Sequence, residues 1–175
     1  MIGSGAGLLA LALLLGIGAG FAWGALRPAY VGEVSDGGAV IDRAASPANV
    51  QFTGFAWFVI LTALLGLVVG VVAWRAVGRK RSRGGVWWMV WAMVVAALGA
   101  IAVYLFGNWF ALRLTPVPDH DALSDGTQFS LVPPIAPGAA WAAAPLVAGL
   151  VYWFANLAAY TRERDEISEV ATLSA

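Results

Sequence analysis

The chain has 175 residues, of which 61% are hydrophobic and 11% are charged, and its formal net charge is zero. Soluble domains average about 45–50% apolar and about 25% charged residues, so this composition indicates an integral membrane protein. The neutral balance gives no reason to expect nucleic acid as a partner, and the absence of cysteine excludes disulfides, thiol catalysis and cysteine metal sites. The length fits a single transmembrane domain over residues 1–175.

Uncharged apolar runs that are long enough to be membrane spans recur along the chain. A span needs about 20 apolar residues to cross a hydrocarbon core of about 30 Å, and a helix satisfies all of its own backbone hydrogen bonds in lipid. We place spans at about 2–26, 52–74, 86–112 and 138–160, with loops at 27–51 and 113–137, a connector at 75–85 and a tail at 161–175. The expected fold is an all-α, antiparallel four-helix transmembrane bundle.

The connector between the second and third spans predicts the orientation in the membrane. It carries basic side chains and no acidic one: Arg75, Arg79, Lys80, Arg81 and Arg83. Because short basic loops stay in the cytoplasm, this connector is expected on the cytoplasmic side of a bacterial inner membrane. Both termini are then cytoplasmic, and the two longer loops face outside.

Both longer loops contain turn signals between short apolar stretches. Asp36-Gly37 lies between valine-containing stretches, which is a strong hairpin signal. Asp125-Gly126 precedes QFSLV, which predicts one further strand. Because an isolated two-stranded hairpin is only marginally stable, we expect the two loops to pack together as a small extracytoplasmic β-cap.

Glycines at four-residue spacing mark one face of each of the first two spans. They are Gly16, Gly20 and Gly24 in the first span and Gly66 and Gly70 in the second. Such faces let a neighbouring backbone come close, and dispersion packing then holds helices together in lipid. The face serves either a partner or the protein's own bundle, and we favour the bundle. Pro145 predicts either a kink in the fourth span or a late helix start.

Polar candidates for chemistry are sparse. The one histidine, His120, lies among Asp119, Asp121 and Asp125, which are weak candidates for a metal or acid–base site. Because neighbouring loop residues rarely converge on one ion, we expect a solvated loop, with no catalytic residue, no metal and no cofactor. No ionisable residue lies in the middle of a span, which argues against a self-sufficient ion-coupled transporter.

Two similar stretches, WGALRP (23–28) and WFALRLTP (109–116), each end a span. Tryptophan followed by arginine is typical of a membrane boundary, so we interpret Trp23 with Arg27, and Trp109 with Arg113, as outer interface anchors. Trp74 with Arg75 is the corresponding anchor at the inner boundary. The alternative is a true duplication, in which two helical hairpins are related by a pseudo-two-fold axis along the membrane normal. We favour convergence on boundary chemistry.

Several sequence features together resemble one family. They are a first span that ends in Trp23, Leu26 and Pro28, the FTGFAWF start of the second span, its VVAWR end with a basic connector, and VPPIAPG before the fourth span. The chain resembles a family of actinobacterial, mycobacterial-type four-span membrane proteins of unknown function. The resemblance implies a membrane protein of the cell envelope and implies no reaction.

These features predict a non-enzymatic accessory, assembly or interaction subunit of the cell envelope. Its expected partners are the lipid bilayer and either another membrane protein or a second copy of the chain. The alternative is a component of a lipid or small-molecule transport system, which requires an oligomer to enclose a path. An envelope enzyme that uses the Asp119–Asp125 loop ranks third.

Overall fold

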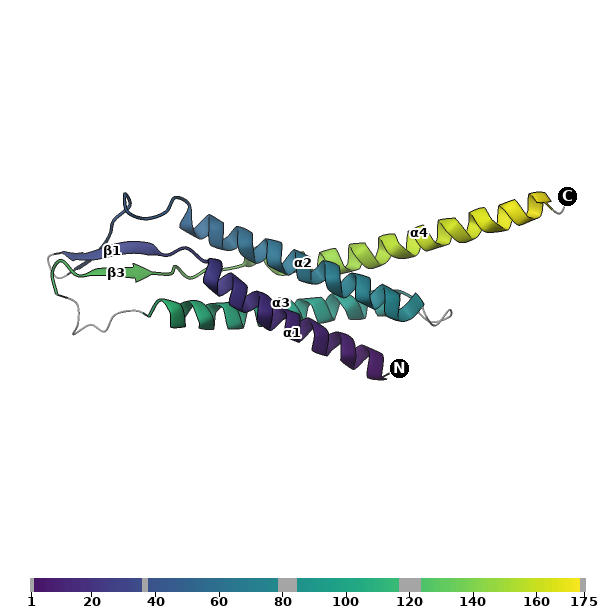
Figure 1. The fold of residues 1–175 in the computed structure, drawn as a ribbon, viewed down its shortest axis with the longest axis horizontal. Helices are drawn as coiled ribbons and strands as arrows, with labels where there is room; N and C mark the ends of the chain where they lie inside the picture. Colours follow the sequence, from purple (N-terminus) through teal and green to yellow (C-terminus); the bar gives the residue numbers. More distant parts are fainter. Residues whose placement is uncertain (1, 36–37, 79–84, 117–123, 174–175) are drawn as a thin grey trace.

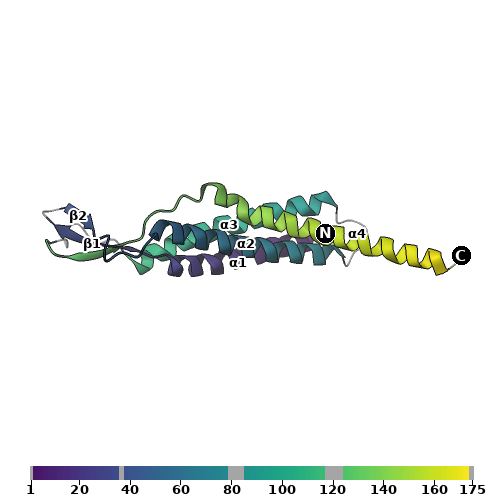
Figure 2. The same cartoon turned by 90° about the horizontal axis from the view of Figure 1, so that it is seen from above.

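The computed structural model describes residues 2–35, 38–78, 85–116 and 124–173, with the backbone alone at 2, 39, 77–78 and 163–173. The molecule is elongated, with the helices side by side and a small sheet at one end (Figure 1). The C-terminal part of α4 projects beyond the other helices at the opposite end. Figure 2, turned by 90°, shows β1 and β2 at the end farthest from the C-terminus.

The long helices are α1 (Ile2–Leu26), α2 (Val50–Gly78), α3 (Val86–Leu114) and α4 (Ala143–Leu173). Four helical segments are long and apolar enough to cross a membrane, which agrees with the expected number of spans. The chain reverses direction between successive helices (Figure 1). The second candidate span begins at Val50, two residues before the expected start, and the fourth begins at Gly138, as expected.

Pro145 lies in the first turn of α4, so the late helix start is the correct alternative. A short 3₁₀ helix, η2 (Gly138–Ala142), precedes α4. The first backbone N–H groups of an α-helix have no partner within the helix, so proline is tolerated there without loss of a hydrogen bond. The fourth span therefore begins as 3₁₀ and continues as α.

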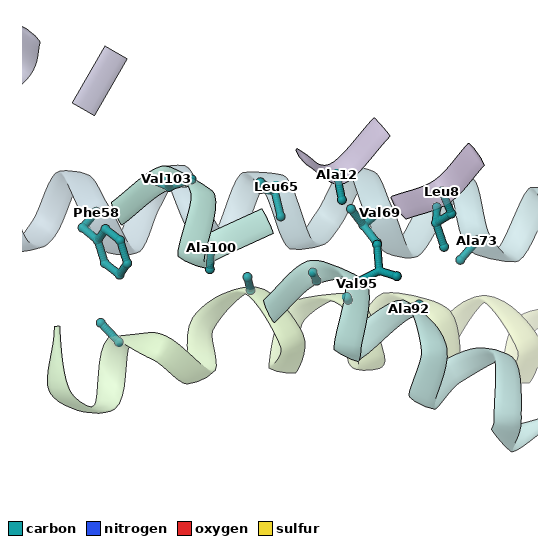
Figure 3. Close-up of a cluster of buried hydrophobic side chains, with 14 of the residues drawn as sticks. Leu8, Ala12, Phe58, Leu65, Val69, Ala73, Ala92, Val95, Ala100 and Val103 are labelled. Atoms are coloured by element: carbon teal, nitrogen blue, oxygen red, sulfur yellow. The ribbon is translucent and has the colours of Figure 1, made fainter. Parts of the chain in front are cut away.

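The helix core is built mainly from small side chains. α1 packs most extensively against α3, and α2 against α4. Figure 3 shows small side chains between the helices, such as Ala12, Ala73 and Ala92, with Phe58 at one end of the cluster. Larger exposed side chains, for example Leu14 and Leu64, lie on the outside of the bundle. Small side chains inside and large apolar side chains outside suit a lipid environment, because lipid tails are as apolar as the side chains that they surround.

The sheet consists of β1 (Tyr30–Ser35), β2 (Gly38–Ile41) and β3 (Gln128–Leu131) in the order β2-β1-β3. Both pairings are antiparallel. This confirms that the two loops form one small three-stranded sheet, although the turn residues Asp36 and Gly37 lie outside the described residues.

The second loop joins the sheet through a glycine turn. Gly126 has a φ of 86°, a conformation that L side chains rarely adopt. Its N–H donates to the carbonyl of Val34, and the Val34 N–H donates to the carbonyl of Thr127. These bonds extend the β1–β3 pairing up to the turn, as the Asp-Gly signal predicted.

Candidate functional site

The glycine face of α1 packs against the backbone of α3. A Cβ at Gly16 would lie 2.5 Å from the carbonyl oxygen of Gly99, and one at Gly20 would lie 2.9 Å from that of Val103. A Cβ at Gly24 would lie 2.7 Å from the carbonyl oxygen of Gly107. The partners on α3 rise in the same order as the glycines, so the two helices run parallel at backbone contact distance.

The glycines of α2 make the same kind of contact with α4. A Cβ at Gly66 would collide with the carbonyl of Ala144, and one at Gly70 would lie 2.8 Å from that of Ala148. The residue numbers of the contacting pairs increase together along both helices, so α2 and α4 also run parallel. The structure therefore places both glycine faces within the protein's own bundle.

Trp23 and Arg27 are buried in the bundle, so the prediction that they are anchors at the outer lipid interface is wrong. The Trp23 side chain is 0% exposed and that of Arg27 is 8% exposed. Trp23 Nε1 donates to the carbonyl of Gly54 on α2 at 2.8 Å. Gly107 on α3 provides the space, since a Cβ there would overlap the Trp23 ring.

Arg27 is a buried cation that joins three parts of the chain. One terminal nitrogen, Nη1, donates to Asn108 Oδ1 at 2.6 Å, which connects the end of α1 to α3. The other, Nη2, donates to the carbonyl of Pro133, in the segment that leads to α4. The guanidinium carbon lies 4.7 Å from the centre of the Trp23 ring, a cation–π distance. We call Trp23, Arg27, Asn108 and Pro133 the arginine clasp.

The acceptors of the arginine clasp are neutral. Burial lowers the pKa of Arg27, and the nearby Tyr104 opposes this by raising it. Because the guanidinium group of arginine ordinarily loses its proton only far above neutral pH, the side chain stays charged at neutral pH. Nε of Arg27 is buried and makes no hydrogen bond to the described part of the chain. The clasp therefore holds a fixed positive charge by hydrogen bonds and by an aromatic face.

An aromatic cluster lies beside the clasp and takes one ring from each of α1, α2 and α3 and one from η2, the 3₁₀ helix that precedes α4. Trp23 of α1 lies 5.1 Å from Phe58 of α2 and 6.0 Å from Tyr104 of α3, measured between ring centres. Trp141 of η2 lies 5.7 Å from Phe58 and 5.2 Å from Tyr104. The two contacts of Trp141 are edge-to-face, a geometry that contributes about 0.5–1.5 kcal/mol for each pair beyond burial. The cluster joins α1, α2, α3 and η2 at the end of the bundle that carries the sheet.

The second Trp–Arg pair lies on the surface. Trp109 is 51% exposed, and the guanidinium carbon of Arg113 lies 5.4 Å from the centre of its ring. Trp74 is half-buried and Arg75 is exposed, both near the opposite end of α2. These positions suit a boundary role, which stays a prediction because the structure contains no membrane.

Sequence reasoning missed the clasp although a periodic signal was present. Gly16, Gly20, Trp23, Gly24 and Arg27 follow the spacing i, i+4, i+7, i+8 and i+11 and so share one helix face. A face that buries its glycines also buries the other residues of that series. The acceptor carbonyl of Pro133, however, is 106 residues away in sequence, and no local pattern indicates it.

The acidic loop lies mostly outside the described residues, because Asp119, His120 and Asp121 fall there. Asp125 is described and exposed, in the turn that precedes β3. Among the residues that the structure describes, no cluster of three or more His, Cys, Asp or Glu side chains is arranged to hold a metal.

Comparison with protein-family models, with curated proteins and with solved structures finds no match to this chain. The resemblance to an actinobacterial membrane-protein family therefore remains a prediction from the sequence. The functional reading rests on the geometry of the molecule.

Proposed function

We propose that the protein is a multi-pass protein of a bacterial cell membrane that acts as a non-enzymatic accessory or interaction subunit of the envelope. Both termini lie in the cytoplasm, and the three-stranded sheet lies outside. The carrying observation is that the arginine clasp and the aromatic cluster fix the helices directly below a sheet with two unpaired edges. Within the described residues, the outer edges of β2 and β3 pair with no further strand.

A sheet held in this way is suited to contact with a partner. An open strand edge offers backbone hydrogen bonds to an added strand, and exposed apolar side chains beside it add buried area. Val40 on β2 is 55% exposed, although it is apolar and belongs to the part of the chain expected in water. The glycine faces pack internally, so the sheet is the surface that we assign to a membrane-protein partner or a second copy.

The proposed topology is tested with single cysteines, because the chain has none of its own. Ser124→Cys, in the exposed turn before β3, is expected to react with a membrane-impermeant maleimide on intact cells. Ser82→Cys, in the basic connector, is expected to react only after the membrane is permeabilised. Labelling of the Ser82→Cys variant on intact cells overturns the orientation.

The partner is tested by site-specific photo-crosslinking in native membranes, followed by purification in mild detergent. A photoreactive amino acid at exposed Gln128 on β3 is expected to give one defined adduct. The same amino acid at Leu14, 68% exposed on the outer face of α1, is the control and is expected to give lipid adducts. An adduct of twice the chain mass identifies a homo-oligomer. If no position on the sheet gives a defined protein adduct, the interaction function is wrong.

The alternative function, a component of lipid or small-molecule transport, is favoured by one observation: a groove at the base of the sheet. It is lined by residues of β1, β2 and the start of α2. A transport role predicts that the purified oligomer moves fluorescent lipid between the leaflets of proteoliposomes. The interaction role predicts no such movement.

A further inference from the structure

The groove at the base of the sheet is defined by Tyr30, Val40, Ile41, Arg43 and Gln51. Its volume is about 550 Å³, within the range of about 300–1,000 Å³ that is typical of small-molecule sites. The groove is partly open to the surface. We call it the sheet-base groove.

The groove lies at the level where the apolar helices end. Tyr30 follows closely on Leu26, the last residue of the first candidate span, and Gln51 is in the first turn of α2. In a bilayer, the polar headgroup layer begins where the hydrocarbon core ends. The groove is therefore placed beside the headgroups and glycerol backbones of one leaflet.

Arg43 is the charged residue that lines the groove. Its side chain is exposed, and no carboxylate pairs with it in the part of the chain that the structure describes. The carboxylate of the adjacent Asp42 binds the backbone instead: its Oδ1 accepts hydrogen bonds from the N–H groups of Ala44 and Ala45. Among the residues that line the groove, Arg43 therefore carries the one charge, and that charge is positive.

The other walls of the groove suit an amphipathic ligand. Tyr30 and Gln51 offer hydroxyl and amide groups, which bind phosphate and glycerol oxygens. Val40 and Ile41 are 55% and 44% exposed, and Phe52, next to Gln51, is 69% exposed. Val40 and Ile41 thus give the groove an apolar wall, and Phe52 is an exposed aromatic side chain at the start of α2.

We propose that the sheet-base groove binds an anionic phospholipid, with its phosphate at Arg43 and its acyl chains beside Phe52. The inference rests on the membrane insertion proposed above. It is independent of whether the sheet also contacts a protein partner. Arginine suits this role because its planar fork of donors matches phosphate oxygens in a bidentate manner.

The test uses the full-length chain, purified in mild detergent and depleted of lipid, with bound lipid counted by native mass spectrometry. Dioleoyl-phosphatidylglycerol, dioleoyl-phosphatidylcholine and inorganic phosphate are added separately. The wild type is expected to retain phosphatidylglycerol in preference to phosphatidylcholine. Arg43→Gln is expected to lower phosphatidylglycerol occupancy about fivefold, which corresponds to the roughly 1 kcal/mol typical of one basic residue at an anionic surface. Arg43→Lys should keep part of the preference.

Arg113→Gln is the matched control, because Arg113 is also an exposed arginine near the sheet end of a helix. It is expected to lower phosphatidylglycerol occupancy less than Arg43→Gln does, because Arg113 does not line the groove. Equal losses in both variants, no loss in Arg43→Gln, or displacement of the lipid by millimolar phosphate would each overturn the phospholipid site. If the wild type inserts into nanodiscs but shows no lipid preference, this inference fails while the membrane assignment stands. Failure to insert overturns both.

Discussion

Replacing Arg27 with alanine is expected to lower the free energy of unfolding by about 3 kcal/mol, because its two acceptors are left without a donor. Hydrogen bonds to a charged group contribute about 1.5–3 kcal/mol each. Arg27 donates to Asn108 Oδ1 and to the carbonyl of Pro133, and its guanidinium covers the Trp23 ring. Unfolding in a titration of mixed detergent micelles, followed by tryptophan fluorescence, measures the loss.

Arg113→Ala is the matched control for this substitution. Arg113 also stacks on a tryptophan four residues earlier, but both side chains are exposed. An exposed cation–π pair contributes about 0.5–1 kcal/mol, so the control is expected to lose no more than that. Equal destabilisation by the two variants would contradict the assignment of Arg27 to a buried clasp.

A double-mutant cycle with Asn108→Ala separates the hydrogen bond from the rest of the arginine. The Arg27–Asn108 pair is expected to show a coupling energy of about 1–3 kcal/mol, since residues in one hydrogen-bond network are not additive. Strict additivity would mean that the 2.6 Å contact adds nothing to stability. The remaining effect of Arg27→Ala then measures the contact with Pro133 and Trp23.

The spans, the strands and the glycine contacts follow patterns that are local in sequence. Apolar length predicts a span, Asp-Gly predicts a turn, and glycines at four-residue spacing predict a close helix contact. Each depends on neighbours within a few residues, so one sequence is enough to reveal it. Apolar length does not predict where a helix changes type: the fourth span begins as the 3₁₀ helix η2 and becomes α-helical at Ala143.

The arginine clasp and the aromatic cluster depend on contacts between distant segments, and for that reason the sequence does not reveal them. Trp23 and Trp109 are followed by the same Ala-Leu-Arg letters, yet one ring is buried and the other is half exposed. What separates them is the helix face, because Trp23 lies on the glycine face of α1. Trp109 lies two residues after Gly107, the glycine that receives the Trp23 ring, and therefore lies on a different face of α3.

The same pair of motifs bears on the idea of duplication. The parallel contacts of α1 with α3 and of α2 with α4 are compatible with two hairpins related by an axis along the helices. Symmetry would give the two Trp–Arg pairs equivalent surroundings, whereas they differ in burial and in partners. The stacking of arginine on tryptophan is shared. The pairs therefore share local chemistry, and the clasp is specific to the first copy.

The second large effect is expected at the contact between α2 and α4. Gly66→Leu should lower the free energy of unfolding by about 3 kcal/mol, at the upper end of the range for overpacking, because the obstacle is backbone. A Cβ at Gly66 collides with the carbonyl of Ala144, and neither helix backbone can yield without separating from the other. The measurement is the same detergent-unfolding titration that is used for Arg27.

Gly18→Leu on α1 provides the matched control, because it introduces the same side chain into a long apolar helix. A Cβ at Gly18 meets nothing within 4 Å in the described structure. Leucine favours a helix over glycine by roughly 0.5–1 kcal/mol, so this variant is expected to be neutral or slightly more stable. The opposite signs at Gly66 and Gly18 distinguish a packed glycine face from a helix that merely tolerates glycine. Equal responses would mean that α2 and α4 do not pack through Gly66, and the parallel pairing of the bundle would have to be redrawn.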